Sequence, residues 1–464
     1  MNSETHRRQA LVIGGSIAGL LAARVLADYY QGVIIIERDD LSMESKHRRG
    51  IPHGRHAHAL LAGGQGAIEE LLPGISAQLI ESGAVEADPL NDGTWFFEGG
   101  AFCKFPSGIT GVLVSRPLLE STIRRRVRSL PNVEIVGGLA VRGLIASKDG
   151  DRVIGVQLDD RSIGADLVVD ASGRGSQAPA WLAAIGYEPP REEKVEIQLA
   201  YTTREFRFRN GSLGDDKFIV IAPTPDGKRG GVAALQEDGR FIVTLFGHFG
   251  QEAAGDLEGF IHFAKSLPSP LIYDAVRDAD PIGEPSTFKF PANKRRKYES
   301  LRRFPKGFLT FGDAICSFDP IYGQGMSVAA LEAIVLHNTM RRGGHDLARR
   351  FFGDAAGVID NPWQIAVGGD LRMPETIGKR GLEVRIVNRY ISSVHRNCHV
   401  DRRTALAFTQ VAQLLAKPTS LFKPGLLLRV LWGNYFSRRQ DLEKLDGNVF
   451  TTADHGNSLH QSGF

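Results

Sequence analysis

The sequence predicts an α/β fold with three parts: a first domain built on a parallel sheet, an antiparallel-sheet domain inserted into it, and a C-terminal helical region. Three observations predict this arrangement. The chain opens with a strand, a glycine-rich turn, a helix and a second strand, which is the pattern of a parallel β-α-β unit. From Lys194 the hydrophobic period changes from helical to alternating, as in an antiparallel sheet. After about Arg341 the pattern is mostly helical to near Leu445.

The composition is that of a large globular protein. The chain has 464 residues, 42% hydrophobic and 23% charged, with a formal net charge of +3, which excludes a disordered chain, a coiled coil and a collagen-like repeat. Glycine is in excess, with 53 residues, so we expect many tight turns and close backbone approaches. The cysteines Cys103, Cys316 and Cys398 are too few and too far apart for a disulfide framework or a zinc site. We therefore expect a reducing compartment and no metal.

Charge is distributed unevenly along the chain. From Arg341 onward 18 Lys and Arg stand against 11 Asp and Glu, so this part carries +7 and the rest −4. The basic part indicates either a solvated helical surface or a contact with an acidic partner or an anionic membrane. Within it, Leu421 to Phe436 is very apolar, with Lys423 and Arg429 among its residues. This segment is either a helix packed on the fold or one that meets a membrane or a lipid-like substrate.

The sequence also indicates where the protein is located and whether it binds nucleic acid. The polar start of the chain, Met1 to Arg8, has no signal-peptide pattern. We therefore expect a cytoplasmic protein, either free or peripheral to the membrane through its basic C-terminal region. No basic run is interleaved with exposed aromatic residues, so we expect no nucleic-acid partner.

The first motif lies between the first strand, Ala10 to Ile13, and the helix that follows it. Val12-Ile13-Gly14-Gly15-Ser16-Ile17-Ala18-Gly19 has the form of the dinucleotide-binding fingerprint, with Ser16 at the usual second glycine. Gly14 makes the turn, the backbone at Ser16 approaches a pyrophosphate, and Gly19 lets helix and strand pack closely. The second strand, Gly32 to Ile36, ends at Glu37, where an acid binds ribose hydroxyls and disfavours a 2′-phosphate. The motif therefore predicts FAD or NAD, not NADP.

The other expected elements follow in chain order. Lys46 to His58 is a basic, histidine-rich loop, and a helix follows from about Ala59 to Leu72. Ser115-Arg116-Pro117 predicts a helix start, with a capping serine and a proline in the first turn. Further strands are expected at Val133–Val136, Val153–Leu158, Leu167–Asp170, Val195–Tyr201, Lys217–Ala222, Gly231–Leu235, Arg240–Phe246 and Phe308–Phe311.

Two further motifs follow strands. Leu167 to Asp170 leads into the turn Ala171-Ser172-Gly173-Arg174-Gly175. Phe311-Gly312-Asp313-Ala314 is followed by Pro320-Ile321-Tyr322-Gly323-Gln324-Gly325-Met326, which leads into a helix. An acid at a strand end can accept hydrogen bonds from sugar-like hydroxyls, and the helix start adds a partial positive charge.

These three motifs, in this order and separation, resemble the FAD-dependent aromatic hydroxylase and monooxygenase superfamily. The resemblance implies a discontinuous, Rossmann-like FAD-binding domain of residues 1–80, 106–185 and 295–340. It also implies a substrate-side β-sheet domain of residues 81–105 and 186–294, and a C-terminal helical region of residues 341–464 with a disordered tail.

A narrower resemblance is to the bacterial squalene-epoxidase-like branch, which includes polyene epoxidases. It covers most of the chain to about Gly381 and is loose beyond. The stretches that carry it are Arg49-Gly50-Ile51-Pro52-His53-Gly54-Arg55-His56-Ala57-His58, Ser115-Arg116-Pro117-Leu118-Leu119-Glu120, Asn361-Pro362-Trp363 and Asp370-Leu371-Arg372-Met373-Pro374-Glu375.

The resemblance implies a role for individual residues. Asp313 would bind the flavin ribityl chain, Pro320 would lie beside the isoalloxazine ring, and Gly323 to Met326 would face its pyrimidine end. Arg55 and Arg116 would contact FAD, with Arg116 near the pyrophosphate. The residues expected to bind FAD are Gly14, Gly15, Ser16, Ala18, Gly19, Glu37, Arg38, Arg55, Arg116, Val141, Asp170, Gly173, Gly312, Asp313, Pro320, Gly323, Gln324, Gly325 and Met326.

Two pairs of residues carry more than one interpretation. Asp170 and Gly173 are expected first as sheet-and-turn elements, because Ser172 stands where the hydroxylases often have an Asp-Gly pair that touches NAD(P)H. His56 and His58 are the candidates for proton handling, with a structural or phosphate-adjacent role as the alternative.

The expected function is an FAD-dependent monooxygenase of secondary metabolism. It would transfer one oxygen atom from O₂, through a flavin C4a-hydroperoxide, to a hydrophobic polyene, terpenoid, quinone or polyketide, by epoxidation or hydroxylation. Electrons would come from NAD(P)H docked on the flavin domain or from a separate flavin reductase as partner. The alternatives are an FAD-dependent isoprenoid reductase or desaturase without oxygen transfer, and a flavin-binding partner protein. A flavin halogenase is disfavoured, because the chain has no Trp-x-Trp motif.

Overall fold

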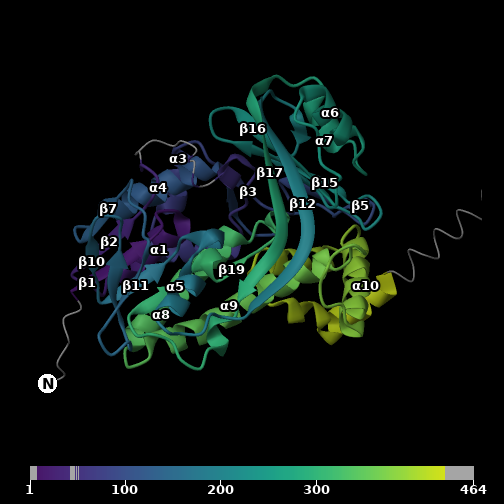
Figure 1. Cartoon of the computed structure of the whole chain (residues 1–464). Coiled ribbons are helices and arrows are strands. Elements are labelled where there is room, and N and C mark those ends of the chain that lie inside the picture. The colour runs from purple at the N-terminus through teal and green to yellow at the C-terminus, as the bar shows by residue number, and fades with distance from the viewer. Residues whose placement is uncertain (1–7, 42–47, 49, 51, 434–464) are drawn as a thin grey trace, which may run out of the picture.

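A computed structural model describes residues 8–41, 48, 50 and 52–433. Two sheets organise these residues, and helices of the C-terminal third pack beside them (Figure 1). The first sheet, with β1, β2, β7 and β11, lies on the left of Figure 1, and the long strands β12, β16 and β17 lie at its centre. The predicted α/β fold with an inserted sheet and a C-terminal helical region is thus confirmed.

The first sheet is parallel throughout, in the order β18-β11-β1-β2-β7. Its carboxyl ends therefore meet along one edge, where ligands of open α/β sheets bind. The strands are Gln9–Ile13 (β1), Gly32–Ile36 (β2), Val133–Val136 (β7), Leu167–Asp170 (β11) and Phe308–Thr310 (β18). Their side chains are mostly apolar on both faces, as expected of a sheet covered on both sides.

The helices packed in this domain include Ile17–Leu26 (α1), Ala62–Leu71 (α2), Ile75–Glu81 (α3), Arg116–Arg128 (α4) and Gly325–Arg342 (α8). Helix α4 begins as predicted: the Ser115 hydroxyl accepts a hydrogen bond from the Leu118 backbone N–H at 3.2 Å, and Pro117 lies in the first turn. Helix α1 packs against both α4 and α8, so the start of α1 is held from two sides.

The second sheet has eight strands in the order β19-β17-β12-β16-β15-β14-β4-β5. Neighbouring strands are antiparallel except for β14 and β4. The strands are Gly93–Phe97 (β4), Gly100–Ala101 (β5), Glu192–Arg207 (β12), Phe218–Ile221 (β14), Arg229–Gln236 (β15), Arg240–His248 (β16), Pro281–Arg296 (β17) and Cys316–Ser317 (β19).

The two faces of this sheet have different neighbours. Helices Leu257–Lys265 (α6) and Leu271–Val276 (α7) pack on one face, around Phe206, Phe241 and Phe260. On the other face Tyr201 and Phe246 belong to a cluster that includes side chains of the C-terminal half. Strand β17 and the second half of β12 were not predicted, because their residues do not alternate regularly and the pairing passes through two bulges.

Smaller elements complete the chain before the C-terminal helices. A three-stranded sheet is made of Gly143–Ala146 (β8), Val153–Gln157 (β9) and Ser162–Gly164 (β10). Val85–Ala87 (β3) pairs with Gly111–Leu113 (β6), Ser212–Asp215 forms β13 and Ala178–Ala184 forms α5.

The C-terminal region is helical, as predicted. Its helices are Leu347–Asp370 (α9), Leu382–Asn397 (α10), Arg402–Ala412 (α11) and a helical segment over residues 424–433, preceded by a 3-10 turn over Pro418–Phe422 (η6). The expected end near Leu445 and the expected disordered tail lie outside the described residues. Within the described ranges no helix is both long and apolar enough to cross a membrane.

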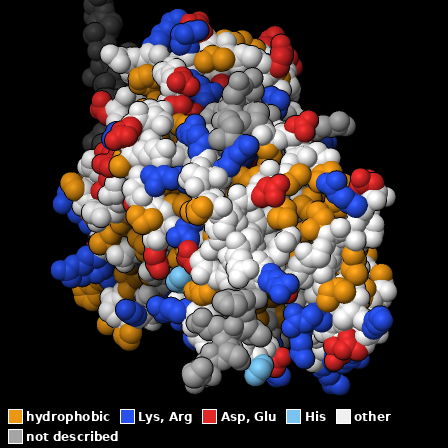
Figure 2. All heavy atoms as spheres, turned by 90° about the vertical axis from the view of Figure 1, so that its left-hand side faces the viewer, with side chains coloured by type: hydrophobic (Ala, Val, Ile, Leu, Met, Phe, Trp, Pro, Cys, Tyr) orange, Lys and Arg blue, Asp and Glu red, His pale blue; other side chains and the backbone are white. Residues whose placement is uncertain are grey.

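The C-terminal helices touch both domains. Val394 and Val430 share a buried cluster with Leu90 and Phe102 near the edge of the second sheet. At the other side, Gln413 accepts hydrogen bonds from the backbone N–H groups of the first turn of α2 at 2.9 Å. The C-terminal region therefore closes the space between the two sheets. On the opposite side of the molecule, which Figure 2 shows, charged side chains of both signs are scattered among hydrophobic ones.

The close approach of α1 to the glycine turn gives a stability prediction. A Cβ atom at Gly19 would lie 1.8 Å from the carbonyl oxygen of Gly14, so we expect Gly19→Ala to lower the free energy of unfolding by about 1–3 kcal/mol. Gly66, an exposed residue of α2, is the matched control, because its Cβ would meet nothing within 4 Å. Urea unfolding should show Gly66→Ala as stable as the parent or more so, and equal losses in both variants would contradict the packing described.

Candidate active site

The glycine turn after β1 lies at the carboxyl edge of the parallel sheet. Gly14 has φ +103°, which favours glycine, and a Cβ there would lie 2.6 Å from the carbonyl oxygen of Ala171. Its backbone N–H donates to the Ile36 carbonyl at 2.8 Å. At the end of β2, the Glu37 carboxylate accepts a hydrogen bond from the Gly15 N–H at 2.8 Å. The sequence prediction thus placed the turn and the acid correctly beside each other.

A buried carboxylate holds the start of α1. Glu120 accepts a hydrogen bond from the Ser16 hydroxyl at 2.8 Å, and Arg116 donates to the same hydroxyl at 2.9 Å. Arg124 and Arg48 each lie 2.6 Å from the Glu120 carboxylate. Burial raises the pKa of Glu120, but the guanidinium groups of Arg116 and Arg48 outweigh it and hold the pKa below its ordinary value. The carboxylate therefore stays charged and fixes Ser16 and Arg116 together.

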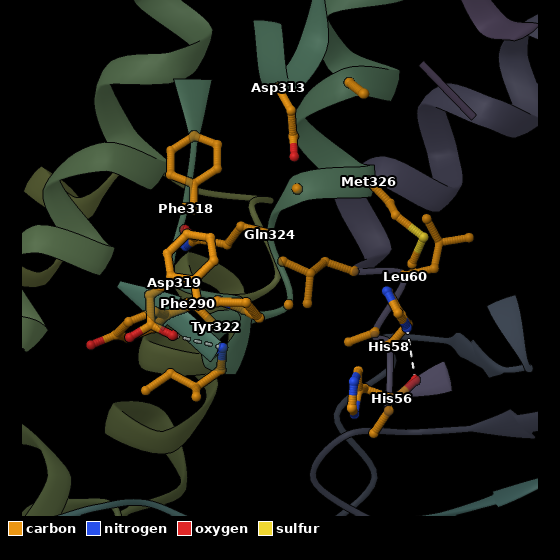
Figure 3. A pocket seen from close by; sticks show the side chains of 18 of the residues that line it. His56, His58, Leu60, Phe290, Asp313, Phe318, Asp319, Tyr322, Gln324 and Met326 are labelled. Carbon is orange, nitrogen blue, oxygen red and sulfur yellow. Dashed lines mark hydrogen bonds between the residues drawn. The ribbon is translucent and has the colours of Figure 1, made fainter. Parts of the chain in front are cut away.

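Asp313 lies after β18 and points into the cavity (Figure 3). The loop that carries it is anchored to α8, because the Gly312 N–H donates to the fully buried Glu332 at 2.8 Å. Burial raises the pKa of Asp313, while the charges of Arg116 and Arg174 lower it. Asp313 is thus a partly buried acceptor near the charges of Arg116 and Arg174, and no ion pair joins it to either of them.

The segment from Pro320 to Met326 forms the wall below Asp313. A 3-10 turn, Pro320–Tyr322 (η5), is capped by Asp319, whose carboxylate accepts from the Ile321 N–H at 2.9 Å (Figure 3). Helix α8 then starts at Gly325 with no side-chain cap. The buried Gln324 Oε1 and Asp319 Oδ2 have no hydrogen-bond partner among the described residues. Buried polar atoms of this kind mark a place where a bound molecule would complete the hydrogen bonds.

His56 and His58 lie on the wall opposite Phe318 and Asp319 (Figure 3). The His56 Nδ1 lies 2.7 Å from the Thr203 hydroxyl, which in turn lies 2.7 Å from the Thr244 hydroxyl. The His58 Nδ1 lies 2.8 Å from the His56 carbonyl oxygen. The His56 ring also packs edge-on against Tyr201, with centroids 4.3 Å apart. Both histidines thus reach the cavity, and His56 is fixed there by the second sheet.

A buried acid pair was missed by the sequence analysis. Asp370, at the end of α9, accepts hydrogen bonds from Asn293 at 2.6 Å and from the Tyr322 hydroxyl at 3.2 Å. Its carboxyl group also interacts electrostatically with that of Asp319. Burial raises the pKa of Asp370 to about 6 and that of Asp319 well above its ordinary value. Asp370 begins one of the stretches that carry the narrower resemblance, and Asp319 precedes Pro320. No pattern in the sequence indicates that these two carboxyl groups lie close together.

Arg174 lies in the turn after β11, and the sequence assigned it no role. Its guanidinium donates to the Ser317 hydroxyl at 2.7 Å and lies 4.3 Å from the centroid of the Phe290 ring. It lines the cavity near Asp313. A charged residue inside a glycine turn at a strand end was the signal that could have marked it.

The far end of the cavity is aromatic. Trp95, Phe97 and Phe408 line it together with His395 from α10. His395 is buried, and neither of its ring nitrogens has a hydrogen-bond partner among the described residues. Burial, with the nearby charge of Arg372, lowers the pKa of His395 to about 3. This histidine is therefore neutral, and its ring adds no charge to the cavity wall.

One continuous cavity of about 1130 Å³ joins these parts. Its wall includes most of the predicted cofactor residues and both histidines. They are Gly14, Ser16, Ala18, Glu37, Arg38, His56, His58, Arg116, Val141, Gly173, Asp313, Pro320, Gly323, Gln324, Gly325 and Met326.

The other predicted residues do not line the wall. Four of them lie next to lining residues without lining the cavity themselves: Gly15, Gly19, Asp170 and Gly312. Asp170 is fully buried and accepts hydrogen bonds from the Ser172 N–H and the Ser176 hydroxyl, which agrees with its expected part in the sheet and turn. Arg55 is exposed and outside the wall, so its contact with FAD stays a prediction.

The residues of the cavity fit an FAD molecule. The start of α1, where Ser16 makes no side-chain cap, offers backbone N–H groups beside Arg116 for a pyrophosphate. Glu37 and Asp313 line the cavity with carboxylates, which can accept hydrogen bonds from sugar-like hydroxyls. The uncapped start of α8 and the unpartnered Gln324 oxygen offer further hydrogen-bonding groups at the cavity wall. Among the described residues no group of three or more His, Cys, Asp or Glu is placed to hold a metal ion.

Comparisons with known proteins agree with this geometry. The chain is 36% identical over 348 residues to Protein Rv3254 of Mycobacterium tuberculosis, covering 72% of this chain and 73% of that protein. It is 25% identical over 453 residues to 6-methylpretetramide 4-monooxygenase of Streptomyces rimosus, covering 93% and 94% of the two chains. The structure of the flavin-dependent brominase Bmp2 superposes with a TM-score of 0.66 at 15% identity, covering 96% of this chain and 100% of the other. No protein-family model matches the chain.

The Glu120 cluster gives a second stability prediction. Glu120→Gln leaves three guanidinium groups without their shared carboxylate, so we expect a loss of about 3–5 kcal/mol in the free energy of unfolding at pH 7. Because the pKa of Glu120 is lowered in the fold, its contribution is present above the unfolded pKa, about 4.3, and is lost as pH falls through the folded value. The difference between parent and variant should therefore shrink in acid.

The control for this measurement is Asp159→Asn, which removes an exposed ion pair with Arg142. Chemical denaturation should show a change of at most about 1 kcal/mol for this variant. A Glu120→Gln chain that unfolds like the Asp159→Asn chain at pH 7 would contradict the role given to Glu120.

Proposed function

We propose a function from the premise that the chain belongs to the superfamily of FAD-dependent monooxygenases with the aromatic-hydroxylase-like fold and is an oxidoreductase. The proposed reaction transfers one oxygen atom from O₂ to a hydrophobic substrate bound between the flavin and the second sheet. The observation that carries the proposal is the continuity of one cavity from the glycine turn, past Asp313 and the start of α8, to the aromatic wall at Phe97 and Phe408.

The residues of the first domain would bind and orient FAD. The start of α1 with Arg116 would hold the pyrophosphate, Glu37 the adenosine ribose, and Asp313 the hydroxyls of the ribityl chain. The partial positive charge at the start of α8 would stabilise negative charge on the pyrimidine end of the ring. When bound, FAD supplies the reduction and activation of O₂ that no side chain can supply.

The second sheet and the C-terminal helices would bind the substrate and exclude water. The wall beyond Asp313 is formed by aromatic and aliphatic side chains such as Tyr201, Phe246 and Phe288. A neutral His395 and a neutral His248, whose pKa is lowered to about 4 by burial, add no charge to this wall. Such a lining suits an apolar molecule, and we propose a polyene, terpenoid, quinone or polyketide, in keeping with the resemblance to the squalene-epoxidase-like branch.

His56 would handle protons where a reaction needs them. Its Nδ1 forms a hydrogen bond with the Thr203 hydroxyl, which fixes the orientation of the ring at the cavity wall (Figure 3). Hydroxylation of a phenol requires a base for the substrate hydroxyl, whereas epoxidation of an alkene does not. A His56→Phe chain that keeps its activity would therefore favour epoxidation.

We propose two alternative sources of electrons. The described residues contain one parallel sheet, which is the one expected to bind FAD. NAD(P)H would therefore dock transiently on the flavin domain, or a separate flavin reductase would act as partner. Oxidation of NAD(P)H by the purified flavoprotein, without added reductase, distinguishes the two.

The direct test of the function is incorporation of labelled oxygen. The purified chain with FAD, a chemical or enzymatic electron source, ¹⁸O₂ and a panel of apolar alkenes and phenols should give a product heavier by one labelled oxygen atom. An FAD-dependent isoprenoid reductase or desaturase would change the hydrogen count only. A product without label from O₂ would therefore replace the proposed function by that alternative, and a chain that binds no flavin would remove both.

The partly buried Asp313 gives a prediction for cofactor binding. Hydrogen bonds to a carboxylate in a buried site contribute about 1.5–3 kcal/mol, so Asp313→Ala should weaken FAD binding roughly ten- to a hundredfold. Titration of the apoprotein with FAD, followed by flavin fluorescence, measures the dissociation constant. Asp149→Ala, which changes an exposed acid in the turn between β8 and β9, should bind FAD as the parent does. Equal affinity of all three chains would show that Asp313 does not contact the cofactor.

A further inference from the structure

Exposed apolar side chains are concentrated in one part of the molecule. Thirteen large hydrophobic residues are exposed among those that the structure describes, and ten of them lie between Ile377 and Trp432. Leu382 is 71% exposed and Trp432 is 70% exposed. Single exposed apolar residues need no explanation, but such a concentration marks an interaction surface.

These side chains lie on amphipathic helices. In the helical segment 424–433, Val430 is buried and Leu426 packs against the cluster it belongs to, whereas Leu428, Leu431 and Trp432 are exposed. Their spacing of three and four residues puts the three exposed side chains on one face. The predicted apolar helix, Leu421 to Phe436, is therefore both packed on the fold and open to a partner. Its residues 434–436 lie outside the described residues.

Helix α10 repeats this arrangement. Leu382 and Ile386 are exposed one turn apart, while Val394 at the other end of the helix is buried. Tyr390 of α10 contacts Phe422 of η6, with ring centroids 5.0 Å apart, and its hydroxyl donates to the Leu421 carbonyl at 2.7 Å. The outer side of α10 and the turn before segment 424–433 are thus joined by direct contact.

The same region is strongly basic. Residues 377–433 contain ten Lys and Arg against two Asp and Glu, so their formal charge is +8. Lys417 and Lys423 are exposed on either side of η6. A second copy of this chain would bring an equal positive charge against the first and would be repelled. An anionic surface with an apolar interior, that is, a lipid bilayer with acidic headgroups, matches both the charge and the apolar side chains.

The cavity reaches the surface in this region. Val387 is 39% exposed and Phe422 is 36% exposed, and both also line the cavity wall. The exposed Thr419 lines it as well. The mouth that these residues form is therefore apolar and lies between the two amphipathic segments.

We propose that residues 377–433 form a docking face for an anionic lipid bilayer and that the mouth at Val387 and Phe422 opens toward the lipid. A hydrophobic substrate dissolved in the membrane would enter the cavity there without crossing water. The entry route rests on the proposed function, whereas docking itself does not. The helices lie on the bilayer surface, in agreement with the finding that no described helix is suited to span it.

Flotation with lipid vesicles tests the docking. The full chain with FAD is mixed with vesicles of phosphatidylcholine alone or with added phosphatidylglycerol. We expect it to float with the anionic vesicles, with a partition coefficient roughly tenfold or more above that for the neutral vesicles, and to be released by high salt. A chain that remains in solution with both kinds of vesicle overturns the proposal.

Variants separate the two contributions. The triple change Leu428→Asp, Leu431→Asp and Trp432→Asp should lower binding to anionic vesicles by roughly tenfold or more, and Lys417→Glu with Lys423→Glu should remove the preference for anionic lipid. The control is Ile154→Asp, an exposed isoleucine of β9 far from this face in sequence, which should bind like the parent. FAD content and the melting temperature show that each variant is folded. Equal flotation of the triple variant and the control contradicts the docking face.

Two further readouts give distinct outcomes. A dimer in light scattering that the triple variant dissociates would assign this face to a second copy and overturn the proposal. Labelled-oxygen incorporation with a water-soluble substrate does not need the membrane. If it fails while flotation succeeds, the proposed function falls and docking stands; if it succeeds while flotation fails, docking falls alone.

Discussion

The carboxylate of Glu120 is the interaction on which the geometry of the cofactor site depends. It is buried beneath the glycine turn and binds Ser16, Arg116, Arg124 and Arg48. Without it, the arginines would repel one another in a region of low dielectric, and the start of α1 would lose its support. Because Ser16 and Arg116 line the cavity at the start of α1, this ion cluster sets the position of the groups proposed to bind the pyrophosphate. A loop held in this way needs little reorganisation when a cofactor binds.

The two sheets line different parts of the cavity with different kinds of side chain. The parallel sheet brings polar groups to its carboxyl edge, where Glu37 and Asp313 face the cavity. The second sheet turns Tyr201 and Phe246 toward the same space, and the C-terminal helices close it with apolar side chains. Acidic and basic side chains thus line the part that would hold FAD, while the walls that the second sheet and the C-terminal helices provide are mostly aromatic and aliphatic. This separation favours an oxygen transfer in which water is excluded from the reacting atoms.

Local sequence patterns predicted the first domain well because its elements are specified locally. Gly14, Gly19 and the start of α8 follow from spacing along the chain, and the resemblance supplied the role of Asp313. The meeting of Asp319 with Asp370, fifty-one positions apart, could not be predicted, because it depends on how α9 packs against η5. The long strand β17 was missed for a related reason: its pairing with β12 is interrupted by bulges that break the alternation. The sequence also could not predict which apolar side chains of the helix are exposed. Val430 and Trp432 are both apolar, but Val430 is buried and Trp432 is exposed, because only one face of the helix packs on the fold.

The central claim is that one molecule of FAD occupies the cavity between the glycine turn and the start of α8, beside an apolar space for substrate. A crystal structure of the chain with FAD tests it most directly. The account predicts the pyrophosphate beside Ser16 and Arg116, the ribityl hydroxyls at Asp313, and the isoalloxazine ring between Pro320 and the wall that carries His56. A flavin bound elsewhere, or a crystal grown with excess FAD that holds none in this cavity, would contradict it.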